Sequence, residues 1–327
     1  TEGGNTEEGE HTEGGNTEEG EHTEGGNPDV GQADGGQDGQ EDLQYLNDLF
    51  HLFNVRDIYG VVCSDHGQYN NELLGKYMFW CKSSATNCNF STKQPTDICA
   101  NLRGIIIGAD TKPENIGNER FLSATLFTGY YKTDAKYLDY RTNSKIGSIG
   151  GKISVFNDNF CATLLSSYQI MVSQNNKYSA CLKNHILSAG IELAGNFRFT
   201  DTIAIVPDFH ADYSFISTED FPSLRGGTIS CQNLNRTNLC AGINLELGDS
   251  NCGGHISAHI NKRLGKELCG HSGTSKFSML EHSRTTSEYA IGIRVRNKNW
   301  GTVSLEASRL TGGTKGSSIK LNVSIDV

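Results

Sequence analysis

The stretch HILSAGIELAGNFRFT, residues 185–200, alternates apolar and polar side chains along its length. One face carries Leu187, Ala189, Ile191, Leu193, Phe197 and Phe199, and the other carries Ser188, Glu192, Asn196 and Arg198. Successive side chains of a β-strand point to opposite faces of a sheet, so this alternation predicts a strand with one apolar and one polar face. Strands of this kind are typical of antiparallel sheets with one face in water.

The same alternation recurs through residues 76–327. It predicts about twelve strands, near residues 76–85, 98–110, 119–132, 144–157, 160–172, 185–200, 202–216, 237–247, 252–263, 287–297, 299–311 and 316–327. Strands of ordinary globular proteins are about five or six residues long, whereas a tilted strand that crosses a membrane needs roughly nine to eleven. The predicted lengths favour strands that cross a membrane.

The predicted connections alternate between short and long. Short turns at 157–159, 200–201, 248–251 and 297–299 alternate with long polar loops at 133–143, 173–184, 217–236 and 264–286. This places the tight turns at one end of the sheet and the long loops at the other. With apolar-out, polar-in alternation, it predicts an all-β fold, a twelve-stranded antiparallel transmembrane β-barrel. The open alternative is a soluble β-sandwich or barrel that buries its apolar face.

The acidic charge of the chain is concentrated at its start. The chain carries 38 acidic and 28 basic residues, but 14 of the acids lie in residues 1–42, which hold no Lys or Arg. This leaves 24 acidic against 28 basic residues for the rest. The unit TEGGNTEEGEH at 1–11 recurs unchanged at 12–22 and has no apolar residue to offset the entropy cost of ordering. We therefore predict that residues 1–40 are a disordered acidic Gly/Glu repeat, a spacer or the end of a passenger segment.

One short amphipathic helix is predicted at residues 41–54, within a linker that spans residues 41–75. Its apolar stripe consists of Leu43, Leu46, Phe50 and Phe53. Glu41 and Asp42 stand at its N-terminal end, where the helix dipole favours acidic side chains. The chain begins without Met and without a recognisable signal peptide, so we expect it to be the C-terminal piece of a longer product.

Several segments resemble a known family. They are YMFW at 77–80, GIIIGAD at 104–110, ATLFTGYY at 124–131, AGIE at 189–192, FRF at 197–199 and PDFHADY at 207–213. In this order and spacing the chain from Tyr77 to its C-terminus resembles the C-terminal β-domain of bacterial autotransporters, the translocators of type V secretion. The resemblance implies a twelve-stranded outer-membrane barrel with an α-helix threaded through the lumen, which links the barrel to a passenger outside the cell.

The resemblance also assigns roles to particular residues. The predicted linker helix stands where such a lumen helix would lie, in front of a barrel domain at residues 76–327. The polar residues expected to face the lumen, where they contact helix or water, are Glu192, Arg198, Asp208, Asp212, Glu246, Arg294, Arg296 and Glu306. Proteins of this family usually end on an aromatic residue that the outer-membrane insertion machinery recognises. This chain carries Val323, Ile325 and Val327 instead.

We therefore expect a translocator in the cell outer membrane that anchors and helps export its own N-terminal passenger, with the tail at the cell surface. Its expected partners are outer-membrane lipid, the barrel-assembly machinery and its own passenger segment, with no nucleic acid and a monomeric barrel. We expect no catalytic residues, no cofactor and no metal. The alternatives are a porin-like channel, a surface antigen or a soluble secreted all-β adhesin. Of the ten cysteines, Cys88, Cys181, Cys231 and Cys269 fall in predicted loops, where disulfides or free thiols are both open.

Overall fold

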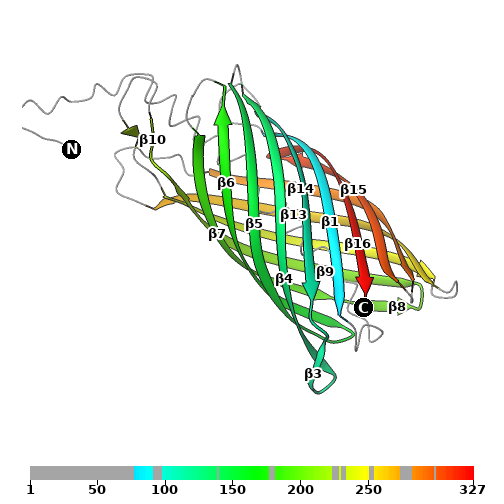
Figure 1. The fold of residues 1–327 in the computed structure, drawn as a ribbon. Helices are drawn as coiled ribbons and strands as arrows, with labels where there is room; N and C mark the ends of the chain where they lie inside the picture. The colour runs from blue at the N-terminus through cyan, green and yellow to red at the C-terminus, as the bar shows by residue number, and fades with distance from the viewer. Residues whose placement is uncertain are drawn as a thin grey trace, which may run out of the picture. The chain divides into compact units, whose positions relative to one another are not determined.

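The computed structural model describes residues 77–90, 98–137, 140–176, 181–222, 228–229, 233–249, 254–272, 282–297 and 300–327. Every regular element in these ranges is a β-strand (Figure 1). Within them, no helix is long and apolar enough to cross a bilayer. The predicted disordered repeat at 1–40 and the predicted helix at 41–54 lie outside the described residues.

Each of the twelve predicted strand ranges overlaps one long strand, and these strands are between 12 and 19 residues in length. The long strands are β1 (Met78–Phe90), β2 (Ile98–Asp110), β4 (Arg120–Tyr137), β5 (Tyr140–Phe156), β6 (Phe160–Asn175), β7 (Cys181–Gly195), β9 (Ile203–Thr218), β12 (Asn233–Asp249), β13 (Gly254–Ser272), β14 (His282–Asn297), β15 (Gly301–Gly312) and β16 (Thr314–Asp326). Four short strands accompany them: β3 (Glu114–Gly117), β8 (Phe197–Thr200), β10 (Phe221–Pro222) and β11 (Thr228–Ile229). The antiparallel all-β prediction is confirmed.

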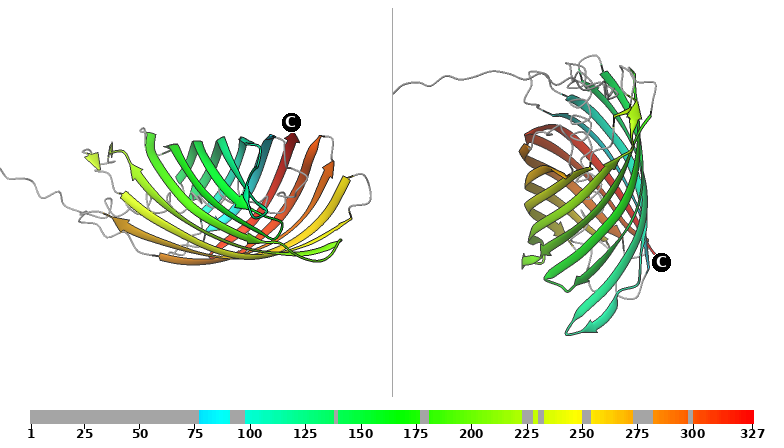
Figure 2. Two further views of the ribbon diagram at one scale, coloured as in Figure 1. Left: turned by 90° about the horizontal axis from the view of Figure 1, so that it is seen from below. Right: turned by 90° about the vertical axis from the view of Figure 1, so that its left-hand side faces the viewer.

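Pairing follows the chain order around one strongly curved sheet (Figure 2). β1 pairs with both β2 and β16, although β16 lies at the far end of the sequence. β9 pairs with β7 and also with β12. Backbone hydrogen bonds between Tyr77 and Val327, 2.9 and 2.8 Å long, continue the β1–β16 pair past the last strand residue. We call the end that holds these two residues and the turn at 157–159 the turn side, and the opposite end the loop side.

The predicted long loops were too long. Strands β4 to β7 continue through most of residues 133–143 and 173–184, so that Cys181, predicted in a loop, is the first residue of β7. Cys88 and Cys269 likewise lie in β1 and β13, and Cys231 lies outside the described residues. Hydrophobic alternation fades towards the loop side because outward and inward residues are both polar there. The backbone ladder needs no apolar side chain and continues.

Along the middle of the long strands most residues that face outward are apolar, and many residues that face inward are polar, unlike in a soluble protein. On β4 the outward Leu126 is 75% exposed, while its neighbour Thr125 is 4% exposed. On β1 the outward Phe79 is 53% exposed and the inward Lys82 is 1% exposed. Burial therefore does not mark a hydrophobic core here. It marks the inner wall of the curved sheet.

Arg198 corrects one prediction about the inner wall. We expected residues 185–200 to form one strand that turns Arg198 inward, but β7 ends at Gly195 and Arg198 lies in the separate strand β8. β8 pairs only with β9, at the turn side, and all four of its residues are exposed. Because β8 has only one neighbouring strand and both of its faces are exposed, alternation there does not separate a buried face from an exposed one.

Candidate functional site

Hydroxyl pairs cover much of the inner wall. Ser144 and Ser173 are hydrogen-bonded at 2.8 Å between β5 and β6, and Ser188 and Ser214 at 2.9 Å between β7 and β9. Both pairs are buried and join neighbouring strands, so they satisfy polar groups inside the wall without introducing charge.

Trp80 and Asp110 form a polar corner at the turn side of β1 and β2. The Trp80 indole Nε1–H donates a hydrogen bond to Asp110 Oδ1 at 3.1 Å, and the Thr125 hydroxyl donates to the same oxygen. Lys82 Nζ lies 4.8 Å from the centroid of the Trp80 ring, at a distance suited to a cation–π interaction. Both segments carry part of the family resemblance in the sequence, but their contact was not predictable from it because Trp80 and Asp110 are 30 residues apart.

Ion pairs connect strands β12, β14, β15 and β16 on the inner wall, and we call this part of the wall the charged half. Arg294 on β14 donates through a guanidinium Nη1–H to Glu246 Oε1 on β12 at 3.1 Å, across the intervening strand β13. Lys320 on β16 lies 2.9 Å from Glu306 and 3.5 Å from Glu288. In each ion pair the carboxylate and the cation come from different strands, so these ion pairs connect the strands through their side chains.

Most residues predicted to face the lumen do lie on the inner wall. Exposed fractions of 3 to 9% are found for Glu192, Asp208, Asp212, Arg294 and Arg296. Glu246 and Glu306 are less covered, with 16% of each side chain exposed. Asp212 accepts hydrogen bonds from His210 at 2.8 Å and Asn238 at 2.9 Å. The described residues hold no group of three or more metal-binding side chains.

The outer face is divided into bands. An aliphatic band includes Ile105, Ile107, Leu126, Ile149, Ile153, Leu164, Ile191, Ile291, Ile293, Leu305 and Ile319, each 43 to 75% exposed. Aromatic side chains flank it on the turn side, namely Tyr77, Phe79, Phe160, Phe197, Phe199 and Trp300. Four tyrosines, Tyr130, Tyr168, Tyr213 and Tyr289, flank it towards the loop side and form the tyrosine girdle. An apolar belt between two rows of aromatic residues is the outer surface of a membrane barrel.

No protein-family model and no curated protein sequence matches the chain. Three solved structures are similar to it. The β-domain of the Bordetella autotransporter BrkA gives a TM-score of 0.64 at 12% identity, over 76% of this chain and 99% of that one. The translocator domain of the autotransporter NalP from Neisseria meningitidis gives 0.58 at 13%, over 90% and 99%. The transport unit of the autotransporter AIDA-I from Escherichia coli gives 0.60 at 13%, over 88% and 96%.

This chain has the autotransporter β-domain fold. The resemblance noted from its sequence is thereby confirmed at the level of fold, which is that of an outer-membrane β-barrel.

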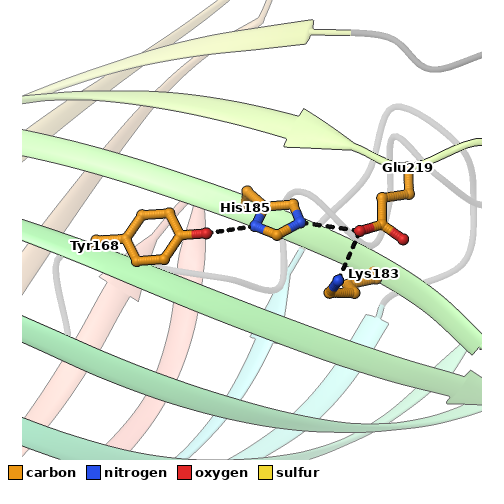
Figure 3. Close-up of polar contacts among 4 residues, drawn as sticks. All are labelled: Tyr168, Lys183, His185 and Glu219. Carbon is orange, nitrogen blue, oxygen red and sulfur yellow. Dashed lines mark hydrogen bonds and ion pairs between the residues drawn. The ribbon is translucent and has the colours of Figure 1, made fainter.

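On the loop side of this autotransporter β-domain fold, a polar cluster on the outer face joins β6, β7 and the connection that follows β9 (Figure 3). The Tyr168 hydroxyl of β6 lies 2.6 Å from His185 Nδ1 of β7, and His185 Nε2 lies 3.0 Å from Glu219 Oε1. Lys183 of β7 donates to the same carboxylate oxygen at 2.7 Å. Glu219 directly follows the last residue of β9. Its contacts with Lys183 and His185 therefore hold the start of the connection after β9 against strand β7.

Replacing Lys183 with Met is expected to raise the pKa of Glu219 towards its ordinary value. The hydrogen bond from Lys183, followed by that from His185, holds the pKa of this carboxyl below its ordinary value. Because the pKa of this carboxyl is lowered, the contact stabilises the folded state at pH values above the ordinary carboxyl pKa. This stabilisation is lost as the pH falls through the lowered pKa. Carbon-detected NMR titration of the Glu219 carboxyl measures the change. Equal values in wild type and K183M would contradict it, and K136M on β4 is the control.

Proposed function

We propose that this chain is a translocator of the outer membrane, a closed barrel of twelve long strands that anchors and helps export its own N-terminal passenger. The observation that carries the proposal is the inverted distribution of side chains, with the aliphatic band outside and polar, charged residues such as Lys82 inside. A soluble barrel or sandwich would place the aliphatic band in its core. This wall has lipid outside and a polar lumen inside.

The strand register supports closure. Following directly opposite residues from Lys82 through β2, β4, β5, β6, β7 and β9 leads to Leu234 on β12. The opposite route, through β16, β15, β14 and β13, leads to Gly248 on the same strand. The two arrivals differ by 248 − 234 = 14 residues. A closed barrel of tilted strands has such a fixed stagger, because the strands spiral around its axis.

The lumen wall offers a place for the predicted linker helix. Beside the charged half lies an apolar part of the inner wall with Ile106, Tyr131, Met171 and Ile186, each 0 to 1% exposed. We propose that the helix at 41–54 packs its stripe of Leu43, Leu46, Phe50 and Phe53 against this part, and that the charged half keeps the remainder of the lumen hydrated. Barrels of eight strands fill with side chains and those of sixteen or more hold open channels, so an intermediate barrel suits one helix.

The last strand carries the proposed insertion signal. Val323 is half-buried, while Ile325 and Val327 face outward with 50% and 67% exposed. We propose that the barrel-assembly machinery reads this outward edge of β16 and that the barrel is monomeric. The backbone pairing of Val327 with Tyr77 makes Val327 part of the wall, continuous with β16.

Protease accessibility on intact bacteria tests the export of the tail. Residues 1–42 hold 14 acidic residues and no Lys or Arg, so a Glu-specific protease cuts this tail and trypsin does not. With the full chain in the outer membrane, the Glu-specific protease is expected to shorten the chain on intact cells, while the trypsin control leaves residues 1–42 whole. Cleavage of the tail only after the cells are broken would contradict export.

Single-channel conductance separates a translocator from a porin. The full chain is expected to conduct weakly because the linker helix occupies the lumen, and deletion of residues 41–54 is expected to raise its conductance. An open porin-like channel would conduct equally with and without these residues. Equal conductance of the two proteins would therefore contradict the plugged lumen and favour the channel.

A further inference from the structure

A row of like charges crosses the outer face immediately beyond the aliphatic band. Arg103 on β2, Lys132 on β4 and Lys145 on β5 face outward and are exposed. Their register is direct, because Arg103 is opposite Lys132 and Lys132 is opposite Lys145. Directly opposite residues have Cβ atoms about 4.5–5.5 Å apart, and like charges in such pairs are destabilising. We call these three residues the cationic row.

A second pair of cations lies next to the cationic row, on its loop side. Lys136 and Arg141, both exposed, are directly opposite each other on β4 and β5. Together with Asp134 they border a hollow of about 420 Å³ that Cys99, Asn101 and Asn143 also line. Within the described residues, the ion pair that these five cations form is that of Lys132 Nζ with Asp134 Oδ1 at 3.8 Å. Among the described residues of this part of the wall, five cations therefore stand against one carboxylate.

The position of the cationic row indicates what neutralises it. Lys132 follows Tyr130 of the tyrosine girdle by two residues, and Arg103 precedes the aliphatic-band residue Ile105 by two, on the same outward face. In the proposed barrel, on which this inference rests, that level is where lipid head groups meet the protein. Tyrosines mark the membrane–water interface, and long cationic side chains reach the charged head groups beside it.

We propose that the cationic row, with Lys136 and Arg141, binds phosphate-bearing head groups of anionic lipids in the loop-side leaflet. Several phosphates lying side by side in a leaflet match several cations fixed side by side on neighbouring strands. Their binding removes the repulsion within the row, so lipid composition on the loop side sets part of the stability of the barrel. The acidic tail also carries opposite charge, so the test below includes it as the competing occupant.

The test uses the full chain refolded in phosphatidylcholine vesicles with and without phosphatidic acid. Wild type is expected to retain phosphatidic acid, counted by native mass spectrometry, and to gain thermal stability from it. The variant R103Q/K132Q/K145Q is expected to bind about fivefold more weakly for each cation removed, on the order of a hundredfold in all. In pure phosphatidylcholine this variant is expected to melt at the same or a higher temperature than wild type, because repulsion is relieved. The control R309Q/K315Q removes two exposed outward cations of β15 and β16.

Each arm has a result that overturns the proposal. Equal retention of phosphatidic acid by wild type and R103Q/K132Q/K145Q would exclude the row, and an equal loss in R309Q/K315Q would reduce it to general charge. Stabilisation by inorganic phosphate as strong as that by phosphatidic acid would indicate an anion site unrelated to lipid. If wild type and R103Q/K132Q/K145Q differed in phosphatidic acid binding only after the tail glutamates had been changed to glutamine, the tail would be the occupant of the cationic row. Failure of all three proteins to refold in any lipid would instead reject the barrel itself.

Discussion

Leu126→Arg is expected to destabilise the folded protein in a bilayer by about 2–4 kcal/mol, the cost of a cation facing lipid at the bilayer midplane. Leu126 is the most exposed of the large apolar side chains described, at 75%, and it lies in the middle of the aliphatic band. On a soluble protein such an exchange at an exposed site would change stability by less than about 0.5 kcal/mol. Equilibrium unfolding by denaturant in lipid vesicles measures the difference.

The control for this prediction is Asn101→Arg. Asn101 also faces outward, but it lies on β2 beside the hollow on the loop side, beyond the cationic row. Near the interface the cost of a lipid-facing cation falls to about 0–1 kcal/mol. Equal effects at the two positions would show that the outer face does not sense membrane depth, contrary to the lipid-facing band.

Gly301→Ala is expected to cost about 3 kcal/mol or more, or to prevent folding, because two penalties add. Gly301 opens β15 with φ of +123°, a conformation that residues with a Cβ rarely adopt. A Cβ built there would lie 2.1 Å from the backbone oxygen of Ser324 on β16. Neither side of this contact is a flexible side chain, so relief requires movement of the β15–β16 pair. The yield of heat-modifiable, folded protein after refolding in vesicles measures the effect.

Gly147→Ala is the matched control. Gly147 lies in β5, faces outward and has no heavy atom within 4 Å of an added Cβ. Removing backbone freedom from the unfolded chain at such a site is expected to leave stability unchanged or to raise it by about 0.4–1 kcal/mol. If both alanine variants folded equally well, the close approach at Gly301 would not constrain the barrel.

The sequence allowed the strands and their faces to be predicted because apolar side chains alternate with polar ones along each long strand, and the two kinds lie mostly on opposite faces of the sheet. The boundaries of β2 at 98–110 were predicted without error. Loop lengths were overestimated because residues such as Lys136 and Arg141 resemble loop residues, although they lie directly opposite each other on the β4–β5 ladder. Arg198 was misplaced for a related reason, since alternation persists in β8 after the inner wall has ended.

Contacts within the candidate site depended on register, which alternation alone does not specify. Glu246 and Arg294 were both predicted to face the lumen, but their ion pair spans β13 and joins residues 48 apart. The corner of Trp80 and Asp110 and the cationic row also arise only when particular residues stand opposite each other. The register determines which inward charges form ion pairs, and it places the outward cations of the cationic row directly opposite one another.

Tryptophan fluorescence in brominated phosphatidylcholine tests the central claim most directly, because the chain has only two tryptophans and they lie on opposite faces. Trp300 is 43% exposed among the turn-side aromatic residues of the outer face, and Trp80 is 5% exposed on the inner wall. Bromine on the acyl chains is expected to quench W80F strongly, since only Trp300 remains, and W300F weakly. Equal quenching of the two variants, or no quenching of either, would contradict a barrel with lipid outside and a polar lumen inside.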